Sequence, residues 1–291
     1  MPHFISILMP SYNHAPYVEA AVRSAMEQKG VDFELIVIDD GSTDESPKIL
    51  QRLAEELGFY FLARENRGMV PTLNELAGMA KGKYICTLAS DDIMPQGRLE
   101  MQVRYMEEHP DVPVCFGQVR KIFPNGSLAE KPDSDYLCGI PSVSFEELFL
   151  LKKTVHGCTE LIRKTAYDSV GGYNQKFKIE DLPLWLALSN KYGDLPVLPD
   201  IFCHYRILPD DRNMHKNFTF IFTQVLDVLK EYKENKLYKK AVDNWKTCWF
   251  SLLAYNNKKE AFFKLPRLCS FSWKFLYRLP KIFIPKFFLK Y

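Results

Sequence analysis

Apolar residues form two kinds of pattern that alternate along the first 90 residues of the chain. Largely apolar runs, which are typical of buried parallel strands, occupy residues 4–9, 33–38 (interrupted by Glu34), 59–62 and 84–88. Apolar residues with the period of an α-helix occupy residues 17–28, 45–57 and 70–80. Short links join these segments. The alternation predicts an α/β fold with a mostly parallel central sheet and helices on both of its faces.

The pattern becomes less regular after residue 95. It predicts strands at 112–123, 159–162 and 197–207, helices at 98–108, 145–151, 164–170 and 182–191, and a loop at 130–142. Two longer helices are predicted at 216–231 and 237–254, followed by a linker-like break at 256–259. We therefore expect a sheet-containing part and a C-terminal helical extension.

Composition agrees with a globular protein and excludes several classes. Of the 291 residues, 47% are hydrophobic and 25% charged, which is ordinary for a chain with a sizeable core. No apolar run reaches the 18 or more residues of a membrane-spanning helix, and the N-terminus lacks the pattern of a secretory signal. Seven scattered cysteines without a C-x-x-C pair predict reduced thiols in a cytoplasmic protein.

The C-terminal tail differs from the rest in charge and aromatic content. Residues 258–291 hold nine Lys or Arg, one acid and ten aromatic residues, whereas residues 1–257 carry a net charge of −6. Such a tail suits an anionic membrane surface, because aromatic rings lie at headgroup depth and each basic residue contributes about 1 kcal/mol. The alternatives are a helix packed on the body and a nucleic-acid surface, and we expect no nucleic-acid partner. We expect a peripheral protein on the inner face of the cytoplasmic membrane.

Acidic and polar residues follow the predicted parallel strands. Ser90-Asp91-Asp92 comes after the fourth strand, Asp39-Asp40-Gly41-Ser42-Thr43-Asp44 after the second, and Pro10-Ser11-Tyr12-Asn13-His14 after the first. Ligands bind at the carboxyl ends of strands in such sheets, and paired carboxylates hold Mg²⁺ or Mn²⁺ together with substrate phosphates. The alternative interpretation is a set of turns that cap the following helices.

These motifs, together with Asn66-Arg67-Gly68, resemble in order and spacing the family 2 glycosyltransferases of the GT-A fold. The resemblance covers roughly residues 3–210. It implies an inverting transfer of a sugar from a nucleotide-sugar donor to an acceptor hydroxyl, with Mg²⁺ or Mn²⁺ as cofactor. It further implies a catalytic domain over 1–212, divided into a nucleotide-binding half (1–95) and an acceptor-binding half (96–212). A helical extension (213–257) and the tail (258–291) follow.

The resemblance also assigns roles to residues of the donor site. Pro10, Ser11 and Tyr12 are expected to line the nucleoside pocket. Asp40, supported by Asp39, is expected to meet the base, which favours UDP- or dTDP-sugars because a carboxylate accepts from the imide N–H of uracil or thymine. Arg67 and Asn74 are expected near base or phosphate, Ser90 at the ribose, and Asp91 at the ribose or donor sugar. Asp92 is the expected metal ligand.

A second acidic pair is the candidate for the catalytic base. The segment Gly171-Gly172-Tyr173 followed by Glu180-Asp181 resembles the family's turn before a helix that begins with two acids. On that pattern Asp181 is the base and Glu180 its helper. The helix dipole lowers the pKa of such an acid and desolvation raises it, so the sequence leaves the sign of the shift open. His156, Glu160 and Trp185 are predicted to face the acceptor, a glycan or lipid-linked sugar.

One departure from the family pattern concerns the diphosphate. Leu208 stands where a histidine is expected, so His215 is the candidate replacement as a metal ligand, and Arg206 or Arg212 the candidates for phosphate contact. A bacterial surface glycan such as lipopolysaccharide, O-antigen or capsule is the predicted product. Two functions are alternatives to a glycosyltransferase. One is a sugar-phosphate nucleotidyltransferase, which usually has a glycine-rich loop after strand 1, and the other is a non-catalytic nucleotide-sugar-binding protein on this fold.

Overall fold

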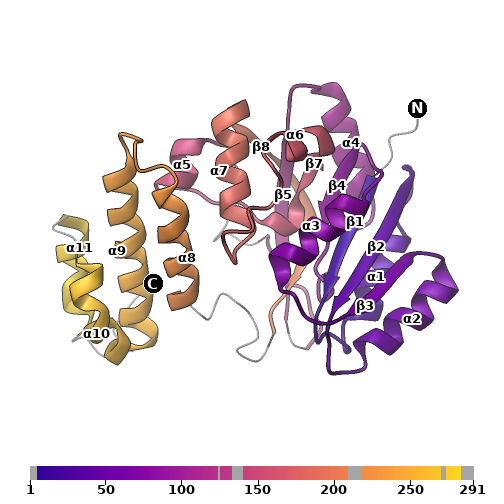
Figure 1. Cartoon of the computed structure of the whole chain (residues 1–291), viewed down its shortest axis with the longest axis horizontal. Helices are drawn as coiled ribbons and strands as arrows, with labels where there is room; N and C mark the ends of the chain where they lie inside the picture. The colour runs from indigo at the N-terminus through magenta and orange to yellow at the C-terminus, as the bar shows by residue number, and fades with distance from the viewer. Residues whose placement is uncertain (1–4, 124, 133–139, 209–217, 270–272, 283–291) are drawn as a thin grey trace. The chain divides into compact units, whose positions relative to one another are not determined.

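The computed structural model describes residues 5–123, 125–132, 140–208, 218–269 and 273–282. The chain divides into two compact units (Figure 1). The first comprises residues 1–145 and 153–209, and the second comprises 146–152 and 210–291. The first unit thus ends near the predicted boundary at 212, but the segment 146–152 within that range belongs to the second unit.

The first unit contains an eight-stranded sheet with the order β3-β2-β1-β4-β7-β5-β8-β6. Its strands are β1 (Ile5–Ser11), β2 (Phe33–Asp40), β3 (Tyr60–Arg64), β4 (Tyr84–Thr87), β5 (Val114–Ile122), β6 (Ser142–Val143), β7 (Leu161–Arg163) and β8 (Leu195–Arg206). β7 and β6 run antiparallel to their neighbours, and the other six strands share one direction. The predicted α/β fold with a mostly parallel sheet is therefore confirmed.

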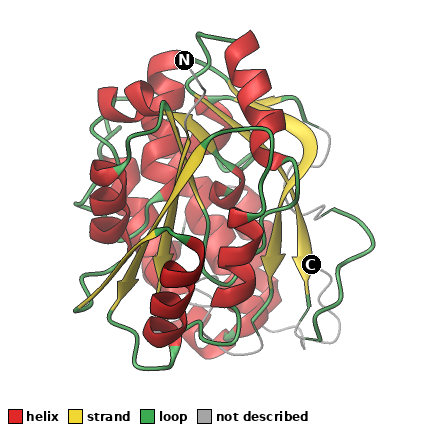
Figure 2. Cartoon of the chain, turned by 90° about the vertical axis from the view of Figure 1, so that its right-hand side faces the viewer, coloured by secondary structure: helices red, strands yellow, loops and turns green. Residues whose placement is uncertain are grey.

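Helices cover both faces of this sheet (Figure 2). They are α1 (Val18–Met26), α2 (Ser46–Leu57), α3 (Met69–Met79), α4 (Arg98–Glu108), α6 (Lys164–Ser169) and α7 (Asp181–Tyr192), with the 3₁₀ helix η1 (Gly157–Thr159). Side chains of a strand alternate between the two faces. The odd-numbered residues Ile5, Ile7 and Met9 of β1 therefore join α1, α2 and α4 in one core, while α3 packs on the other side of β1 and β2.

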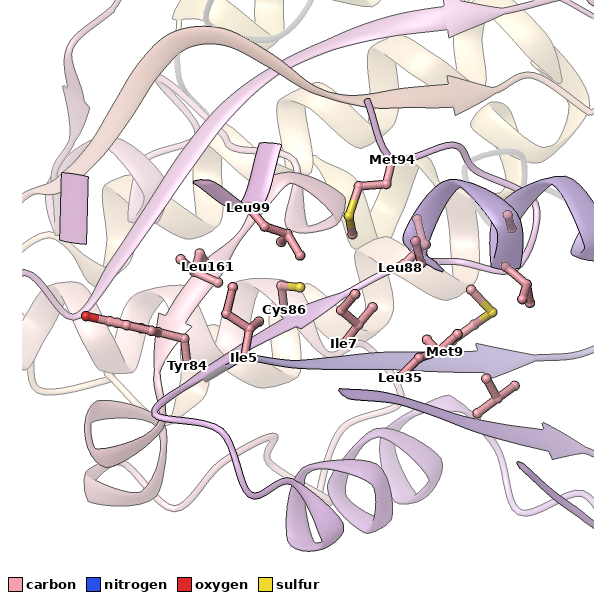
Figure 3. Close-up of a cluster of buried hydrophobic side chains, with 14 of the residues drawn as sticks. Ile5, Ile7, Met9, Leu35, Tyr84, Cys86, Leu88, Met94, Leu99 and Leu161 are labelled. Carbon is pink, nitrogen blue, oxygen red and sulfur yellow. The ribbon is translucent and has the colours of Figure 1, made fainter. Parts of the chain in front are cut away.

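The core beneath α1, α2 and α4 contains residues from the central strands (Figure 3). Ile5, Ile7, Cys86, Leu88 and Leu99 are all fully buried there. Burying an aliphatic side chain of this size contributes roughly 1.5–3 kcal/mol. This packing fixes β1 against β4, and with them the loops that leave the carboxyl ends of the two strands.

Several predicted elements differ from the structure in their details. Of the predicted strand at 159–162, Thr159 ends the 3₁₀ helix η1, and Leu161 and Ile162 belong to the three-residue strand β7. The predicted loop at 130–142 ends in the short strand β6, and its residues 133–139 lie outside the described part. Both differences concern two- or three-residue elements, whose conformation depends on the neighbouring strands because they are too short to carry a periodic pattern.

The second unit consists of helices. These are α5 (Phe145–Phe149), α8 (Phe218–Lys230), α9 (Tyr238–Asn256), α10 (Lys258–Leu268), α11 (Trp273–Arg278) and η3 (Leu279–Ile282). Trp245 Nε1 on α9 donates to the carbonyl oxygen of Phe149 at 3.0 Å, which ties α5 to this unit. Among the described residues, none of the helices has the length and apolar character needed to cross a bilayer.

The tail forms helices that pack on α9, and the predicted break at 256–259 coincides with the point where α9 ends at Asn256 and α10 begins at Lys258. Asn257 caps α10 by accepting from the Glu260 N–H at 3.2 Å. Ala261, Leu268 and Phe275 are buried against α9 residues such as Phe250. The described tail residues are therefore partly structural, as one of the alternatives for this segment held, and only its outer face is open to a partner.

Candidate active site

The carboxyl ends of β1 and β4 flank the point where the strand order reverses. β1 pairs in parallel with β2 on one side and with β4 on the other, so the chain leaves β1 toward one edge of the sheet and later returns on the opposite side. Crevices at such switch points are where open α/β sheets bind ligands. The three sequence motifs after β1, β2 and β4 therefore lie along one edge of the sheet.

The loops after β1 and β2 are joined by side-chain hydrogen bonds. Asn13 adopts the left-handed region at φ +55°, and its Oδ1 accepts from the Thr43 N–H at 2.8 Å. Its own N–H donates to Ser42 Oγ at 2.8 Å. Asp44 accepts from the N–H groups of Ala15 at 3.0 Å and Ser46 at 2.9 Å. Of these residues, Asp44 bonds an N–H of the next helix, as the capping interpretation predicts, whereas Ser42 and Thr43 bond the loop after β1.

The carboxylates of Asp39 and Asp40 are both buried and have protein donors. Asp39 accepts from the N–H and the hydroxyl of Ser42, at 2.8 and 2.6 Å. Asp40 accepts from the N–H groups of Arg67 at 2.9 Å and Gly68 at 2.8 Å, and also pairs with the guanidinium of Arg64. A carboxylate has about four acceptor positions, so these bonds leave Asp39 more free acceptor capacity than Asp40.

Gly41 allows the loops after β2 and β3 to lie this close. Its φ is +80°, and a Cβ at this position would lie 2.6 Å from the backbone nitrogen of Asn66. Asn66 in turn donates from Nδ2 to the Asp40 carbonyl oxygen at 2.7 Å. Only glycine fits both the backbone angle and this approach.

The remaining expected donor residues differ in how open they are. Ser11 is buried with its hydroxyl unpaired, Pro10 is half-buried, and Tyr12 leaves 49% of its surface exposed. The Arg67 guanidinium is largely exposed and lies 3.5 Å from Glu75. A buried unpaired hydroxyl costs free energy unless a ligand or water satisfies it, so Ser11 marks a place where a polar ligand would be stabilised.

Asn74 is engaged within the chain. Its Oδ1 accepts from the Tyr167 hydroxyl at 2.8 Å and the Tyr173 N–H at 3.2 Å, and its Nδ2 donates to the Tyr173 carbonyl oxygen at 2.8 Å. These bonds hold the Gly171-Gly172-Tyr173 turn against α3. These bonds satisfy the hydrogen-bonding groups of the Asn74 side chain without any ligand.

The Ser90-Asp91-Asp92 segment is held between the β1 loop and the end of β8. His14 Nδ1 lies 2.9 Å from Ser90 Oγ and 3.7 Å from an Asp91 carboxylate oxygen. On the other side, Arg206 donates its N–H to Asp92 Oδ1 at 2.8 Å and its Nε–H to the Asp91 carbonyl oxygen at 2.6 Å. The two adjacent carboxylates are thus fixed by residues from both halves of the sheet.

The two carboxylates of this segment are crowded and poorly hydrated. Asp92 is 1% exposed, and burial together with the neighbouring Asp91 charge raises its pKa to about 8. Burial raises the pKa of Asp91 as well, against the opposing effect of His14. Two adjacent buried acids with raised pKa values form a site where a positive charge would be strongly stabilised.

The candidate base lies in a second cluster of acids. Asp181 begins α7, Glu180 precedes it, and Glu160 follows η1; Glu160 is buried and accepts from the Tyr173 hydroxyl at 3.1 Å. Burial, then the charges of Glu180 and Glu160, raise the pKa of Asp181 well above its ordinary range. Desolvation therefore outweighs the helix dipole at this position, which settles the sign that the sequence left open.

The short helix η1 connects the two acidic clusters. Cys158 Sγ lies within 4.8 Å of an Asp92 carboxylate oxygen. The preceding residue, Gly157, has its Cα directly against the Asp181 carboxylate, because a Cβ built on it would lie 2.3 Å from Asp181 Oδ1. Asp92 and Asp181 therefore lie near consecutive residues of η1, although they are 89 positions apart in the sequence.

Other predicted residues lie at varied distances from this centre. The His156 ring is half-buried, 5.8 Å from the ring of Tyr205. The Trp185 ring is 2% exposed and packs edge-to-face on Phe116 at 4.8 Å, so it lies in the core. Leu208 is buried and offers no ligand atom, whereas His215 and Arg212 lie outside the described residues.

Sequence analysis assigned no role to three residues that shape the site. His14 bridges to Ser90, and its only sequence signal was its place after β1. Gly157 makes room for Asp181. Arg98, fully buried, donates to the carbonyl oxygens of Cys158, Phe202 and Glu160 at 2.9–3.0 Å and so positions η1. An arginine at the start of an amphipathic helix gives no signal of such a role.

Comparison with known proteins now decides the family. Residues 6–171 match the family model described as glycosyl transferase family 2, which is more than half of the chain. This chain belongs to glycosyl transferase family 2. The matched range includes the motifs after β1, β2 and β4 and ends at Gly171, ten residues before Asp181.

Curated relatives of this family 2 glycosyltransferase come from bacteria and archaea. An uncharacterised glycosyltransferase of Rickettsia prowazekii is 33% identical over 67% of this chain, and the match spans 62% of that relative's length. The putative teichuronic acid biosynthesis glycosyltransferase TuaG of Bacillus subtilis is 27% identical over 73% of this chain and 82% of its own.

Solved structures with low sequence identity share the fold. S. aureus TarS 1–349 in complex with UDP-GlcNAc superposes with a TM-score of 0.65 at 16% identity, covering 96% of this chain and 80% of that one. The mannosyltransferase PcManGT from Pyrobaculum calidifontis, in complex with GDP-Man and Mn²⁺, gives 0.60 at 16% identity over 99% and 87%. The predicted GT-A fold is confirmed by these likenesses.

The donor set of this family 2 glycosyltransferase fits a hard divalent cation. Asp91 and Asp92 present carboxylate oxygens, and the described bonds to Asp92 come from Arg206 and from Cys203 Sγ at 3.5 Å. Acceptor positions on both carboxylates are therefore left for a cation, which in such sites keeps waters and takes the remaining oxygens from a diphosphate. The residues present are thus compatible with Mg²⁺ or Mn²⁺.

Proposed function

We propose that this protein is an inverting, divalent-cation-dependent glycosyltransferase that moves a sugar from a nucleotide-sugar to an acceptor hydroxyl. The observation that carries the proposal is the placement of Asp92 and Asp181 against consecutive residues of η1. Inversion requires a leaving group stabilised on one side of the sugar and a base on the other. Two acidic clusters that lie near the same short segment would supply both.

The donor half would bind a nucleoside diphosphate at the ends of β1, β2 and β4. Ser11 and Tyr12 would contact the nucleoside, with Ser90 near the ribose and Arg67 at the exposed rim. Asp39 has more acceptor capacity left than Asp40, so we now favour Asp39 for the base, with Asp40 holding the loop after β3. A carboxylate acceptor suits the imide N–H of uracil or thymine, which favours UDP- or dTDP-sugars over GDP-sugars.

Asp92, with Asp91 beside it, would hold Mg²⁺ or Mn²⁺. When bound, such a cation neutralises the charge that develops on the diphosphate as it leaves. The chain's own contribution is to fix both carboxylates from two directions, through His14 and Ser90 on one side and Arg206 on the other.

Asp181 would remove the proton from the attacking acceptor hydroxyl. Its pKa is raised by burial and by the charges of Glu180 and Glu160, which makes it a stronger base than an exposed aspartate. Glu180 has a buried carboxylate oxygen without a described partner, so it is available to orient the acceptor. Glu160, buried and bonded to Tyr173, would act on the acceptor only through Asp181.

The test is a donor screen combined with one substitution. Release of nucleoside diphosphate is measured for UDP-, dTDP- and GDP-sugars with Mg²⁺ and with Mn²⁺, for the wild type and for Asp181→Asn. We expect Asp181→Asn to lower kcat by about 10²–10⁴-fold with donor affinity unchanged. Asp168→Asn, which changes an exposed acid of α6, is the matched control. Near-normal turnover by Asp181→Asn would remove the base from the mechanism.

We further propose that the acceptor is a bacterial surface glycan or its lipid-linked precursor, met at an anionic membrane surface. On the outer face of α10 and α11, Phe263, Trp273 and Tyr277 leave 80–87% of their surface exposed. Lys259, Arg267 and Lys274 are exposed beside them. Large exposed aromatic rings among basic side chains are typical of a surface that contacts a membrane. The relative TuaG is named as a putative teichuronic acid biosynthesis glycosyltransferase, which supports a role in glycan biosynthesis.

Co-sedimentation with liposomes tests this surface. A triple variant with Phe263, Trp273 and Tyr277 changed to Ser leaves the buried tail residues intact and should lose most binding to vesicles with anionic lipid. Tyr60→Ser, which removes an exposed ring from the sheet unit, should bind as the wild type does. Binding that is equal in both variants, or absent in the wild type, would refute the membrane proposal.

A further inference from the structure

Two thiols lie directly behind the carboxylate of Asp92. Cys203, from β8, places Sγ 3.5 Å from Asp92 Oδ2, and Cys158, from η1, completes a group whose ligand atoms all lie within 4.8 Å of one another. Asp92 and Cys203 are buried, and Cys158 is half-buried. The proposed transfer reaction uses neither thiol.

The spacing of these atoms is close to that of a tetrahedral metal site. Zinc binds sulfur at about 2.3 Å and oxygen at about 2.0–2.2 Å, so a tetrahedral site separates a sulfur from an oxygen ligand by about 3.5 Å. The observed separation between Cys203 Sγ and Asp92 Oδ2 is 3.5 Å. The largest separation, 4.8 Å, contracts to a tetrahedral edge by a side-chain movement of about 1 Å.

The backbone that carries both thiols is fixed in advance. Arg98 Nη1 donates to the carbonyl oxygens of Cys158 at 2.9 Å and of Phe202, the residue before Cys203, at 3.0 Å. One guanidinium therefore sets the distance between the two cysteine-bearing segments.

We propose that Asp92, Cys158 and Cys203 form a binding site for a thiophilic divalent cation of the zinc and cadmium class. Thiolate ligands select such cations over Mg²⁺, which prefers oxygen. On binding, each thiol gives its proton to the solvent and a water takes the fourth position. Because Asp92 belongs to both sites, the thiophilic cation would compete with the donor's Mg²⁺ or Mn²⁺. This competition rests on the proposed function, whereas the binding itself does not.

Titration of the full-length chain with Cd²⁺ tests the binding directly. Bound thiolates give a thiolate-to-cadmium charge-transfer absorption in the ultraviolet, which needs no transferase activity. We expect Cys158→Ser and Cys203→Ser each to weaken the tightest Cd²⁺ site by at least about tenfold. Cys269→Ser, which changes an exposed cysteine of the helical unit, should leave that site intact. Circular dichroism checks folding, and if buried Cys203→Ser fails to fold, half-buried Cys158→Ser carries the test.

Two results would overturn the site: unchanged Cd²⁺ affinity in folded Cys158→Ser, or loss of the tightest site in Cys269→Ser. A second experiment measures inhibition of sugar transfer by Zn²⁺ at fixed Mg²⁺, where Cys158→Ser should require at least about tenfold more Zn²⁺ for half inhibition. Equal inhibition of the wild type and of Cys158→Ser by Zn²⁺ would overturn the proposed competition between the two cations. A chain that binds Cd²⁺ as expected but transfers no sugar would refute the proposed function and leave the metal site standing.

Discussion

Replacing Gly157 by alanine should move the proposed base without unfolding the protein. A Cβ at this position would lie 2.3 Å from Asp181 Oδ1, whereas ordinary contacts begin at 3.4 Å. The backbone angle of Gly157 is one that alanine can adopt, and the three atoms nearest to the added Cβ all belong to the Asp181 carboxylate. Because that carboxylate ends a short side chain, it has to shift by about 1 Å to make room.

A shift of this size has a predictable cost in rate. Misplacing a catalytic group by 1 Å costs about 10²-fold, which corresponds to about 2.7 kcal/mol in the barrier. The expected result for Gly157→Ala is therefore a kcat lowered about 100-fold, with an unchanged KM for the donor. The free energy of unfolding should change by less than about 1 kcal/mol, because alanine also restricts the unfolded chain.

The assay is release of nucleoside diphosphate, with urea unfolding measured on the same preparations. Gly78→Ala is the matched control, because a Cβ there meets nothing within 4 Å inside α3. It should keep full activity and gain up to about 1 kcal/mol of stability. The double variant Gly157→Ala with Asp181→Asn completes a cycle. If Gly157→Ala lowers kcat by the same factor with and without the Asp181 carboxylate, the loss of kcat does not act through the proposed base, and the reasoning is refuted.

Three further predictions follow from the described contacts. Arg98→Lys should lower the free energy of unfolding by about 3 kcal/mol in urea titrations, because one ammonium cannot reach the three carbonyl oxygens, while Arg104→Lys on the exposed side of α4 should change little. The base works ionised, so kcat should fall as pH drops through the raised pKa of Asp181. Glu180→Gln removes a neighbouring charge and should move this fall in the pH profile of kcat to lower pH. An unchanged pH profile would contradict the assignment of Asp181 as the base. Asp92→Asn should weaken Mn²⁺ binding in the presence of UDP by at least about tenfold in calorimetry, and equal affinity would exclude it as a ligand.

The amino-acid pattern was sufficient for the architecture and for the edge where the site lies. Alternating strands and helices with short links leave few arrangements other than a parallel sheet covered on both faces. The carboxyl ends of parallel strands share one edge, so acids at the ends of β2 and β4 had to lie along it. Periodicity is a local property, and it is read reliably from elements as long as α2 or β1.

The division of roles among those acids was beyond the sequence. Nothing in the motif after β2 indicates that the Asp40 carboxylate binds Arg64 and two backbone N–H groups, because these donors belong to the end of β3 and the loop after it. Likewise the tail's composition could not separate rings packed on α9, such as Phe275, from rings left open, such as Trp273. Composition records residue types, whereas packing assigns each side chain its neighbours.

What the sequence determined by itself is therefore the fold, the edge of the sheet and the candidate acids. Only the tertiary structure decided that Asp92 and Asp181 lie near consecutive residues of η1, that Gly157 makes room for the Asp181 carboxylate, and that two cysteines lie beside Asp92. It also decided that the pKa of Asp181 is raised rather than lowered. The physical reason is that distances and desolvation arise from residues 20 to 110 positions apart, whose approach is set by core packing and carries no signature in local pattern.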